Sequence, residues 1–242
     1  MRILLTNDDG IKSEGLRLLA KWSRTVGETL VVAPKTEQSA CGQGIVLHRP
    51  IEVMPCDDYA DIGVQAYTVE STPADCVRFA VDRLGDFDLV FSGINKGLNI
   101  GLDVAYSGTC SACFEAAHWG IASVAFSTPP GAFDLAARTL DTVWQYFEEH
   151  RLLDKCILYN VNIPETEPKG IKPVSLGGPY FLDHFVPCGK DLYTLSPYVP
   201  YRLEEHPTIV TDLDAIFSGY CSVTPLTIHR TNYDVLKKLR EL

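Results

Sequence analysis

Long apolar runs are absent from this chain of 242 residues, and so is an excess of positive charge. No run approaches the roughly 18 apolar residues of a membrane-spanning helix, so we expect no membrane partner. The apolar stretch at residues 3–5 is too short for a secretion signal, which predicts a cytoplasmic protein. The formal net charge of −10 argues against binding to a nucleic acid polymer, because such binding needs a basic surface.

The sequence lacks a dinucleotide-binding motif and a complete zinc-binding motif. No G-x-G-x-x-G sequence follows the first apolar run, which argues against a dinucleotide site. Cys110 and Cys113 form a single C-x-x-C, a spacing that redox and zinc motifs use, but a zinc site would need a second pair or suitably placed histidines. We therefore interpret the eight scattered cysteines as reduced and mainly structural.

Apolar strand patterns alternate with helical patterns through the first two thirds of the chain. The expected strands cover residues 2–6, 29–33, 66–69, 88–92, 123–127 and 156–161. One intervening helix has a readable start, with Thr72 as N-cap, Pro73 in the first helical position and Asp75 in the first turn. This alternation predicts an α/β fold, with a Rossmann-like, mostly parallel sheet and helices on both faces.

Two regions depart from that alternation. Residues 44–54 are expected to form two short strands around Pro50. From about 177 to 208 the chain is rich in Pro, Gly and Tyr with weak periodicity, which predicts an extended arm or hairpin. Regular structure is expected to return as a helix at 211–217, a strand at 221–224 and a last helix at about 233–242. We expect residues 1–242 to form one domain.

Polar residues gather where the predicted strands end. Asp8 and Asp9 follow the first strand, Ser39 lies in the loop after the second, and Asn95 follows the fourth. The sequence Ser-Gly-Thr at 107–109 directly precedes a predicted helix. Each cluster alone could be an ordinary turn or helix cap. Because ligands bind at the carboxyl ends of parallel strands, we expect these loops to converge on one site.

The residue types at these positions favour a metal and a phosphate. Asp8, Asp9, Ser39 and Asn95 offer oxygen donors, which suit Mg²⁺ or Mn²⁺ and not zinc or copper. Residues 107–109 would present backbone N–H groups and hydroxyls at a helix start, which suits a phosphate. Together they predict metal-assisted phosphoryl hydrolysis.

Five sequence words carry a resemblance to a known family. They are RILLTNDDGI, VVAPKTEQSA, DLVFSGINKGLNIGLDVAYSGT, NVNIP and TDLDAIFSGYCSVTPL, in this order over nearly the whole chain. The sequence resembles the SurE family of survival-protein nucleotidases. The resemblance implies a divalent-metal phosphatase acting on nucleoside 5′-monophosphates and 3′-monophosphates, with activity on short polyphosphate in some members.

The resemblance also implies roles for single residues. One Mg²⁺ or Mn²⁺ would bind Asp8, Asp9, Ser39 and Asn95, and the two aspartates would be catalytic. From the residues themselves, we expect the substrate phosphate to lie against Asn95 and against Ser107, Gly108 and Thr109. We expect direct attack by a metal-activated water, with either Asp8 or Asp9 as the base. The arm at 177–208 would serve oligomer contacts, in a homodimer or a homotetramer.

Two other protein classes carry acidic residues after a first strand. A phosphatase of the haloacid-dehalogenase type needs Asp-x-Asp, whereas Asp8 and Asp9 are adjacent. A receiver-like regulatory domain needs a phosphoacceptor aspartate at another strand end, where this chain has Asn95, and is about half as long. Phosphatase turnover would exclude the receiver, and the absence of an aspartyl-phosphate would exclude the dehalogenase type.

Overall fold

A computed structural model describes residues 1–199 and 208–241 of the chain. Its centre is a nine-stranded sheet in the order β3-β4-β2-β1-β5-β6-β7-β11-β8. The strands are β1 (Arg2–Thr6), β2 (Glu28–Pro34), β3 (Val53–Cys56), β4 (Gln65–Val69), β5 (Leu89–Lys96), β6 (Ala122–Thr128), β7 (Leu158–Asn162), β8 (Ile171–Pro173) and β11 (Cys221–Pro225). Among the described strands of this sheet, β3 pairs with β4 and β11 with β7 in antiparallel fashion, and the other neighbours pair in parallel. The predicted α/β class with a mostly parallel sheet is therefore confirmed.

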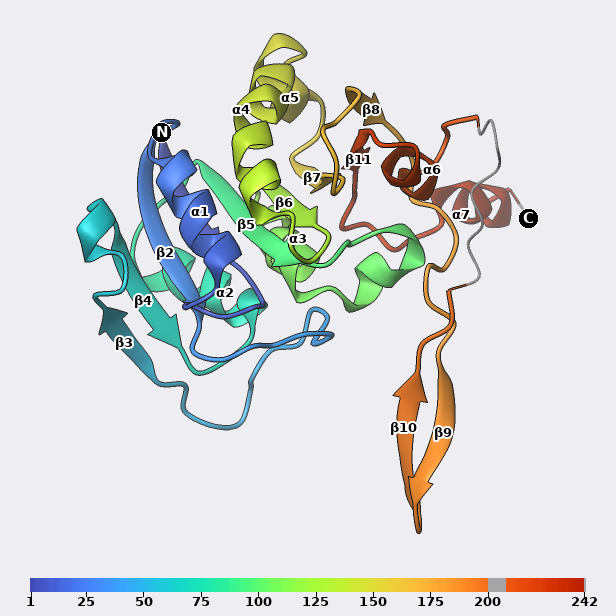
Figure 1. The fold of residues 1–242 in the computed structure, drawn as a ribbon, viewed down its shortest axis with the longest axis horizontal. Helices are drawn as coiled ribbons and strands as arrows, with labels where there is room; N and C mark the ends of the chain where they lie inside the picture. The colour runs from blue at the N-terminus through green and yellow to red at the C-terminus, as the bar shows by residue number, and fades with distance from the viewer. Residues whose placement is uncertain (200–207, 242) are drawn as a thin grey trace.

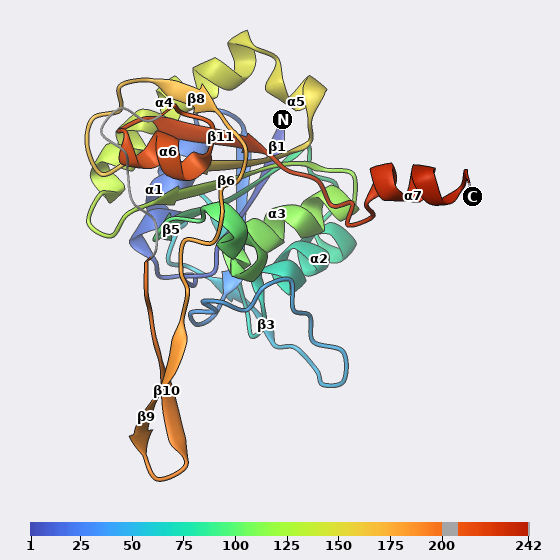
Figure 2. The same ribbon diagram turned by 90° about the vertical axis from the view of Figure 1, so that its right-hand side faces the viewer.

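Helices cover both faces of the sheet (Figures 1 and 2). The helices are α1 (Glu14–Ser23), α2 (Pro73–Arg83), α3 (Gly108–His118), α4 (Phe133–Glu149), α5 (Leu152–Lys155), α6 (Asp212–Phe217) and α7 (Tyr233–Leu239), with 3₁₀ turns η1 (Ala60–Ile62) and η2 (Gly101–Tyr106). Helices α1 and α4 pack together on one face, and α2 and α3 pack together on the other. As the sequence predicts, the Thr72 side chain caps α2 by accepting a hydrogen bond from the Asp75 N–H.

The strand order creates a reversal point at the centre of the sheet. From β1 the chain adds β2 and β4 on one side, and then returns to add β5, β6 and β7 on the other. In open parallel sheets, the crevice at such a point outside the carboxyl ends is where ligands bind. The loops that follow β1 and β5 meet at this place.

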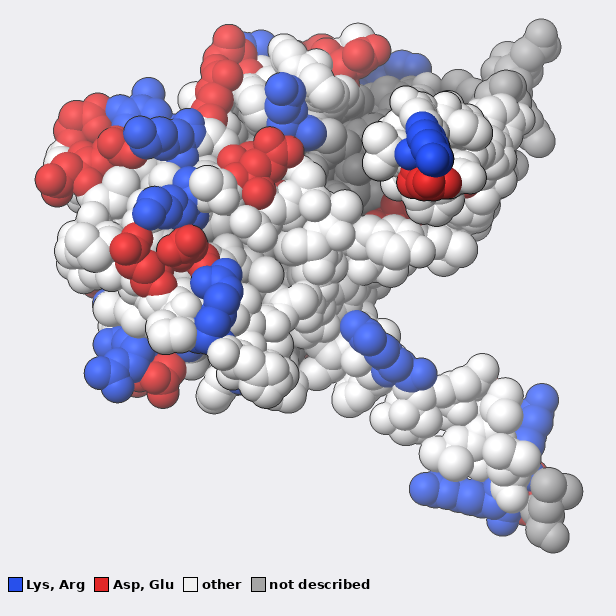
Figure 3. Space-filling view, turned by 90° about the horizontal axis from the view of Figure 1, so that it is seen from below, with Lys and Arg blue, Asp and Glu red and all other residues white. Residues whose placement is uncertain are grey.

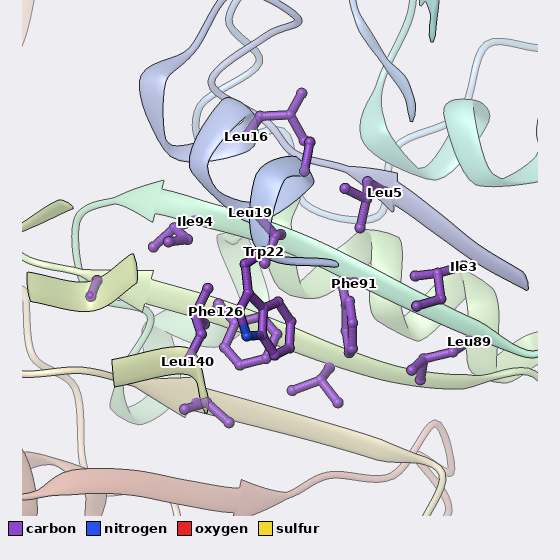
Figure 4. Close-up of a cluster of buried hydrophobic side chains, with 14 of the residues drawn as sticks. Ile3, Leu5, Leu16, Leu19, Trp22, Leu89, Phe91, Ile94, Phe126 and Leu140 are labelled. Atoms are coloured by element: carbon purple, nitrogen blue, oxygen red, sulfur yellow. The ribbon is translucent and has the colours of Figure 1, made fainter. Parts of the chain in front are cut away.

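Aromatic packing holds this central region firmly. The ring of Trp22 on α1 lies 5.4 Å from the ring of Phe91 on β5 and 6.1 Å from that of Phe126 on β6. Figure 4 shows these rings packed among aliphatic side chains of β1, β5 and α4. The Trp22 indole also donates a hydrogen bond of 2.8 Å to Asp141 on α4. The strand ends that carry the polar residues therefore project from a rigid core.

A two-stranded antiparallel hairpin projects from the body, formed by β9 (His184–Gly189) and β10 (Leu192–Ser196) (Figures 1 and 2). It lies within the predicted arm at 177–208. Residues 200–207 of that arm lie outside the described residues. The hairpin exposes several large apolar side chains, namely Phe185, Leu192, Tyr193 and Leu195.

The prediction of two short strands around Pro50 is wrong. Residues 44–52 contain no strand, and only β3 (Val53–Cys56) forms at the end of the predicted region. The Val46 N–H donates to the Asp75 carboxylate instead of to a neighbouring strand. Pro50 has no N–H to contribute to a ladder, so this stretch is held by side chains.

Two strand and helix ends also differ from the predictions. β5 continues past the predicted end at residue 92, and a bulge between Ser92 and Asn95 keeps it paired with β6 up to Lys96. Helix α7 ends at Leu239, while Leu242, where the predicted helix ended, lies outside the described residues. Among the described helices, none has the length and apolar character that a membrane crossing requires.

Candidate active site

The carboxylate of Asp8 lies at the N-terminus of α3. Asp8 is 5% exposed, and its Oδ1 accepts a hydrogen bond of 2.5 Å from the Thr109 hydroxyl. Burial raises the pKa of Asp8 from 3.8 to about 6; the Thr109 hydrogen bond opposes this rise, and the negative charge of Asp9 adds to it. Asp8 is thus a buried carboxylate that needs a positive partner to be ionised at low cost.

Gly108 makes this close approach possible. A Cβ atom on Gly108 would lie 2.7 Å from the Cβ of Asp8, 2.9 Å from its Oδ2 and 3.0 Å from the Sγ of Cys41. Any side chain at position 108 would therefore push Asp8 away from the helix start. The absence of a side chain at Gly108 keeps the Asp8 carboxylate against the first turn of α3.

Asp9 connects the first loop to the end of β5. Its Oδ2 accepts a hydrogen bond of 3.0 Å from the backbone N–H of Lys96. The side-chain nitrogen of Asn95 donates 2.9 Å to the Gly97 carbonyl, so the Asn95 oxygen Oδ1 is left to accept or coordinate. Burial raises the pKa of Asp9, and the nearby negative charge of Glu37 adds to the rise.

The loop after β2 is fixed beside the two aspartates. The Gln38 N–H donates 2.7 Å to the Asp8 carbonyl, and the Gly42 N–H donates 3.0 Å to the Tyr106 carbonyl. Ser39 lies exposed between these anchors, and its hydroxyl donates 2.6 Å to Glu37 Oε1. The four predicted polar loops are thus joined to one another by hydrogen bonds at the reversal point of the sheet.

The two hydroxyl groups at the start of α3 have different partners. Ser107 is the N-cap, and its oxygen accepts a hydrogen bond of 3.0 Å from the Cys110 N–H, which leaves its hydroxyl hydrogen free to point elsewhere. The Thr109 hydroxyl hydrogen is committed to Asp8, in contrast to the role as a phosphate donor that the sequence predicts for it. The remaining donors toward a bound anion are the Ser107 hydroxyl and the Gly108 N–H.

The donor set fits a divalent cation of the Mg²⁺ or Mn²⁺ kind. Two adjacent carboxylates, one amide oxygen and one hydroxyl are hard oxygen ligands. Within residues 1–199 and 208–241, neither Asp8 nor Asp9 forms an ion pair with Lys or Arg. Within the same residues, no group of three or more His, Cys, Asp or Glu side chains is placed so that it could hold a metal ion by itself. A hard cation would supply the missing positive charge.

Comparison with known proteins identifies the family. The family model described as Survival protein SurE matches residues 3–179. The chain belongs to the SurE family. The 5′-nucleotidase SurE 1 of Thermus thermophilus is 42% identical over 250 residues, covering 100% of this chain and 98% of that protein. The 5′-nucleotidase SurE of Alkaliphilus metalliredigens is 37% identical over 254 residues, with 100% and 98% covered.

A solved SurE structure has the same fold. The crystal structure of the SurE protein from Aquifex aeolicus superposes with a TM-score of 0.82 at 33% identity, covering 100% of this chain and 99% of the other. The family resemblance predicted from the sequence words is therefore confirmed. Membership of the SurE family also decides against the dehalogenase-type and receiver-like alternatives.

Sequence reasoning missed one residue of this SurE-family site, Glu37. It accepts the hydrogen bond of Ser39 and places a third negative charge near Asp9. Its position two residues before Ser39 is the signal that could have revealed it. Cys110 contacts the site through its backbone N–H, which donates to Ser107, while burial raises the pKa of its thiol to about 12 and that of Cys113 well above its usual range. Both thiols are therefore neutral and structural.

Proposed function

We propose that this chain is a divalent-metal-dependent 5′-nucleotidase that releases phosphate from nucleoside 5′-monophosphates. The observation that carries the proposal is the contact of the Asp8 carboxylate with the first turn of α3, beside Asp9 and Asn95. This contact brings a candidate cation site and a candidate phosphate site together. The full-length similarity to proteins named 5′-nucleotidase SurE supports the choice of substrate.

Asp8, Asp9, Ser39 and Asn95 would hold one Mg²⁺ or Mn²⁺ ion. When bound, such an ion neutralises phosphate oxygens and lowers the pKa of a coordinated water toward 7 in favourable sites. Asp8 and Asp9 supply the negative charge that retains the ion. Thr109 holds the Asp8 side chain in place through its hydroxyl, and the Lys96 N–H does the same for Asp9.

The substrate phosphate would bind between Asn95 and the turn at 107–109. The Ser107 hydroxyl and the Gly108 N–H donate hydrogen bonds to its oxygens, and the positive end of the α3 dipole adds to the attraction. Water attacks phosphorus directly and passes its proton to Asp8 or Asp9, while the bond to the nucleoside oxygen breaks and that oxygen takes up a proton from solvent. No covalent phosphoenzyme is needed, so a chiral thiophosphate ester should react with inversion at phosphorus; net retention would contradict direct attack.

A panel of phosphate esters tests the proposed activity. The metal-depleted protein is supplied with Mn²⁺ and assayed for phosphate release from nucleoside 5′-monophosphates, nucleoside 3′-monophosphates and short polyphosphates. We expect turnover of the 5′-monophosphates, with slower turnover of the 3′-monophosphates and of short polyphosphate. Absence of phosphate release from every ester would reject the proposal.

The surface is consistent with a small substrate. Positive and negative side chains are interspersed on the body in the view of Figure 3, without a continuous basic area on that face.

The hairpin of β9 and β10 presents exposed apolar side chains and only two strands, and isolated hairpins of this kind are marginally stable in water. We propose that it packs against another copy of the chain, in a homodimer or a homotetramer.

A further inference from the structure

A pocket of about 640 Å³ is lined by Gly97, which lies two residues after Asn95 of the candidate active site. Its floor is formed by the segments that follow three adjacent parallel strands, with Gly97 after β5, Pro129 after β6 and Pro164 after β7. It therefore opens at the same carboxyl edge of the sheet as Asp8 and Asp9. The catalytic loops lie over β2, β1 and β5, and this pocket continues the same edge over β5, β6 and β7.

Aromatic side chains form one wall of this pocket. Tyr180 and Phe217 are stacked, with ring centroids 5.7 Å apart and an interplanar angle of 28°. Phe181 meets Tyr180 at 4.7 Å, and it is 43% exposed. We call the cavity bounded by Gly97, Pro129, Pro164 and these three rings the aromatic pocket. Its wall presents ring surface to whatever occupies it.

Hydrogen bonds join the walls of the aromatic pocket to Asn95 and to the 3₁₀ turn η2 that precedes residues 107–109. The Gly97 carbonyl accepts the side-chain N–H of Asn95 at 2.9 Å. The backbone N–H groups of Tyr180 and Phe181 donate to Asp103 Oδ2 at 3.0 and 2.9 Å. Asp103 lies in η2, which ends at Tyr106, directly before the turn at 107–109. The pocket walls are therefore attached to both sides of the place proposed for the phosphate.

Asp212 fixes the aromatic wall to the body. Its fully buried carboxylate accepts N–H groups from Gly101 at 2.8 Å and from Gly177 at 2.9 Å. These bonds join the start of η2, the segment leading to Tyr180, and helix α6, which carries Phe217. The wall is therefore pre-organised, which lowers the entropy lost when a ligand binds.

We propose that the aromatic pocket holds the nucleobase of the substrate, with Phe181 and Phe217 packing against its face. This inference rests on the proposed nucleotidase function and assigns the base-binding part of the same site. Every base has a flat π-face that stacks on aromatic rings. Glu165, which also lines the pocket, can accept hydrogen bonds from N–H groups on the base edge.

The test compares esters with and without a base. KM and kcat are measured for adenosine 5′-monophosphate and ribose 5-phosphate, using wild type, Phe181→Ala and Phe217→Ala. Phe181→Tyr keeps the ring, and Tyr233→Ala removes an exposed aromatic side chain on α7, far along the chain from the pocket. Base–aromatic stacking contributes enough that KM for the nucleotide should rise about tenfold in both alanine variants. KM for ribose 5-phosphate should stay unchanged in the alanine variants. Phe181→Tyr should keep KM for the nucleotide well below that of Phe181→Ala, and all values for Tyr233→Ala should match wild type.

Binding of adenosine, which has no phosphate, separates this inference from the proposed function. We expect wild type to bind adenosine in a saturation-transfer NMR experiment, and Phe181→Ala to weaken the signal about tenfold. Adenosine binding without hydrolysis of any ester would reject the nucleotidase function while supporting the pocket assignment. Hydrolysis of both esters with equal or no change in KM in the alanine variants would overturn the pocket assignment.

Discussion

Asp8 and Thr109 are hydrogen-bonded at 2.5 Å although 101 residues separate them in the chain. The bond joins the loop after β1 to the first turn of α3. It holds the buried carboxylate of Asp8, one of the proposed cation ligands, against the turn proposed for the substrate phosphate.

Removing the Thr109 hydroxyl should impair catalysis while leaving the fold intact. Thr109→Val keeps the shape but leaves Asp8 Oδ1 without its donor, and hydrogen bonds to charged groups contribute about 1.5–3 kcal/mol. We expect kcat/KM for a nucleoside 5′-monophosphate to fall roughly 10- to 100-fold. Thr109→Ser retains the hydroxyl and should stay near wild type. Equal activity of the valine and serine variants would show that the bond is not used.

A methyl group at position 108 should displace Asp8. Gly108→Ala would place a Cβ 2.7 Å from the Asp8 Cβ, a separation that side-chain carbons do not adopt. We expect loss of most phosphatase activity and weaker Mn²⁺ binding, measured by electron paramagnetic resonance. Gly178→Ala is the matched control, because a Cβ there meets no atom within 4 Å. Wild-type metal binding in Gly108→Ala would contradict the placement of Asp8 at the ion.

Much of this arrangement could be predicted from the sequence. The alternation of strand and helix patterns gave the sheet, and the rule for strand ends brought Asp8, Ser39 and Asn95 to one edge. The Thr109–Asp8 bond could not be predicted, because the sequence shows which loops meet and not which donor each acceptor finds. Residues 44–52 were mispredicted for a related reason: the Asp75 side chain takes the Val46 N–H that a strand would have used.

Asp212 should matter for stability more than for chemistry. Asp212→Asn replaces one of the two carboxylate oxygens that accept N–H groups from Gly101 and Gly177 with an NH₂ group. An unsatisfied buried donor costs about 1–3 kcal/mol of unfolding free energy, measurable by urea denaturation. Gln65→Ala, an exposed change on β4, should cost much less. A urea midpoint for Asp212→Asn equal to that of wild type would contradict the stabilising role of Asp212.

The unfolding free energy that Asp212→Asn removes should also depend on pH. Burial raises the pKa of Asp212 above its unfolded value of 3.8, against the opposing effect of its N–H donors. A raised folded-state pKa stabilises the protein below the unfolded pKa, and that contribution is lost as the pH rises through the folded pKa. The difference in unfolding free energy between wild type and variant should therefore be larger at pH 4 than at pH 7. The opposite trend would contradict the direction of the pKa shift.

The hairpin should determine the assembly state. Phe185→Ser and Tyr193→Ser together remove two exposed apolar side chains from β9 and β10. We expect wild type to show at least twice the chain mass of 26.8 kDa in light scattering at micromolar concentration, and the double variant to show less. Lys190→Ser, between the two strands, is the control. A wild-type protein at the mass of one chain would reject the assembly proposal.

The most direct test of the central claim is Mn²⁺-dependent phosphate release from adenosine 5′-monophosphate by metal-depleted protein. We predict no phosphate release in excess EDTA and recovery of release when Mn²⁺ is restored. Asp9→Asn should lower the rate of release by at least about 100-fold, because mutating even a residue that only contacts a metal ligand lowers metal affinity or activity 10- to 100-fold. Ser39→Ala, which removes a neutral ligand, should lose less than Asp9→Asn. Full activity in excess EDTA, or an Asp9→Asn variant as active as wild type, would contradict the account.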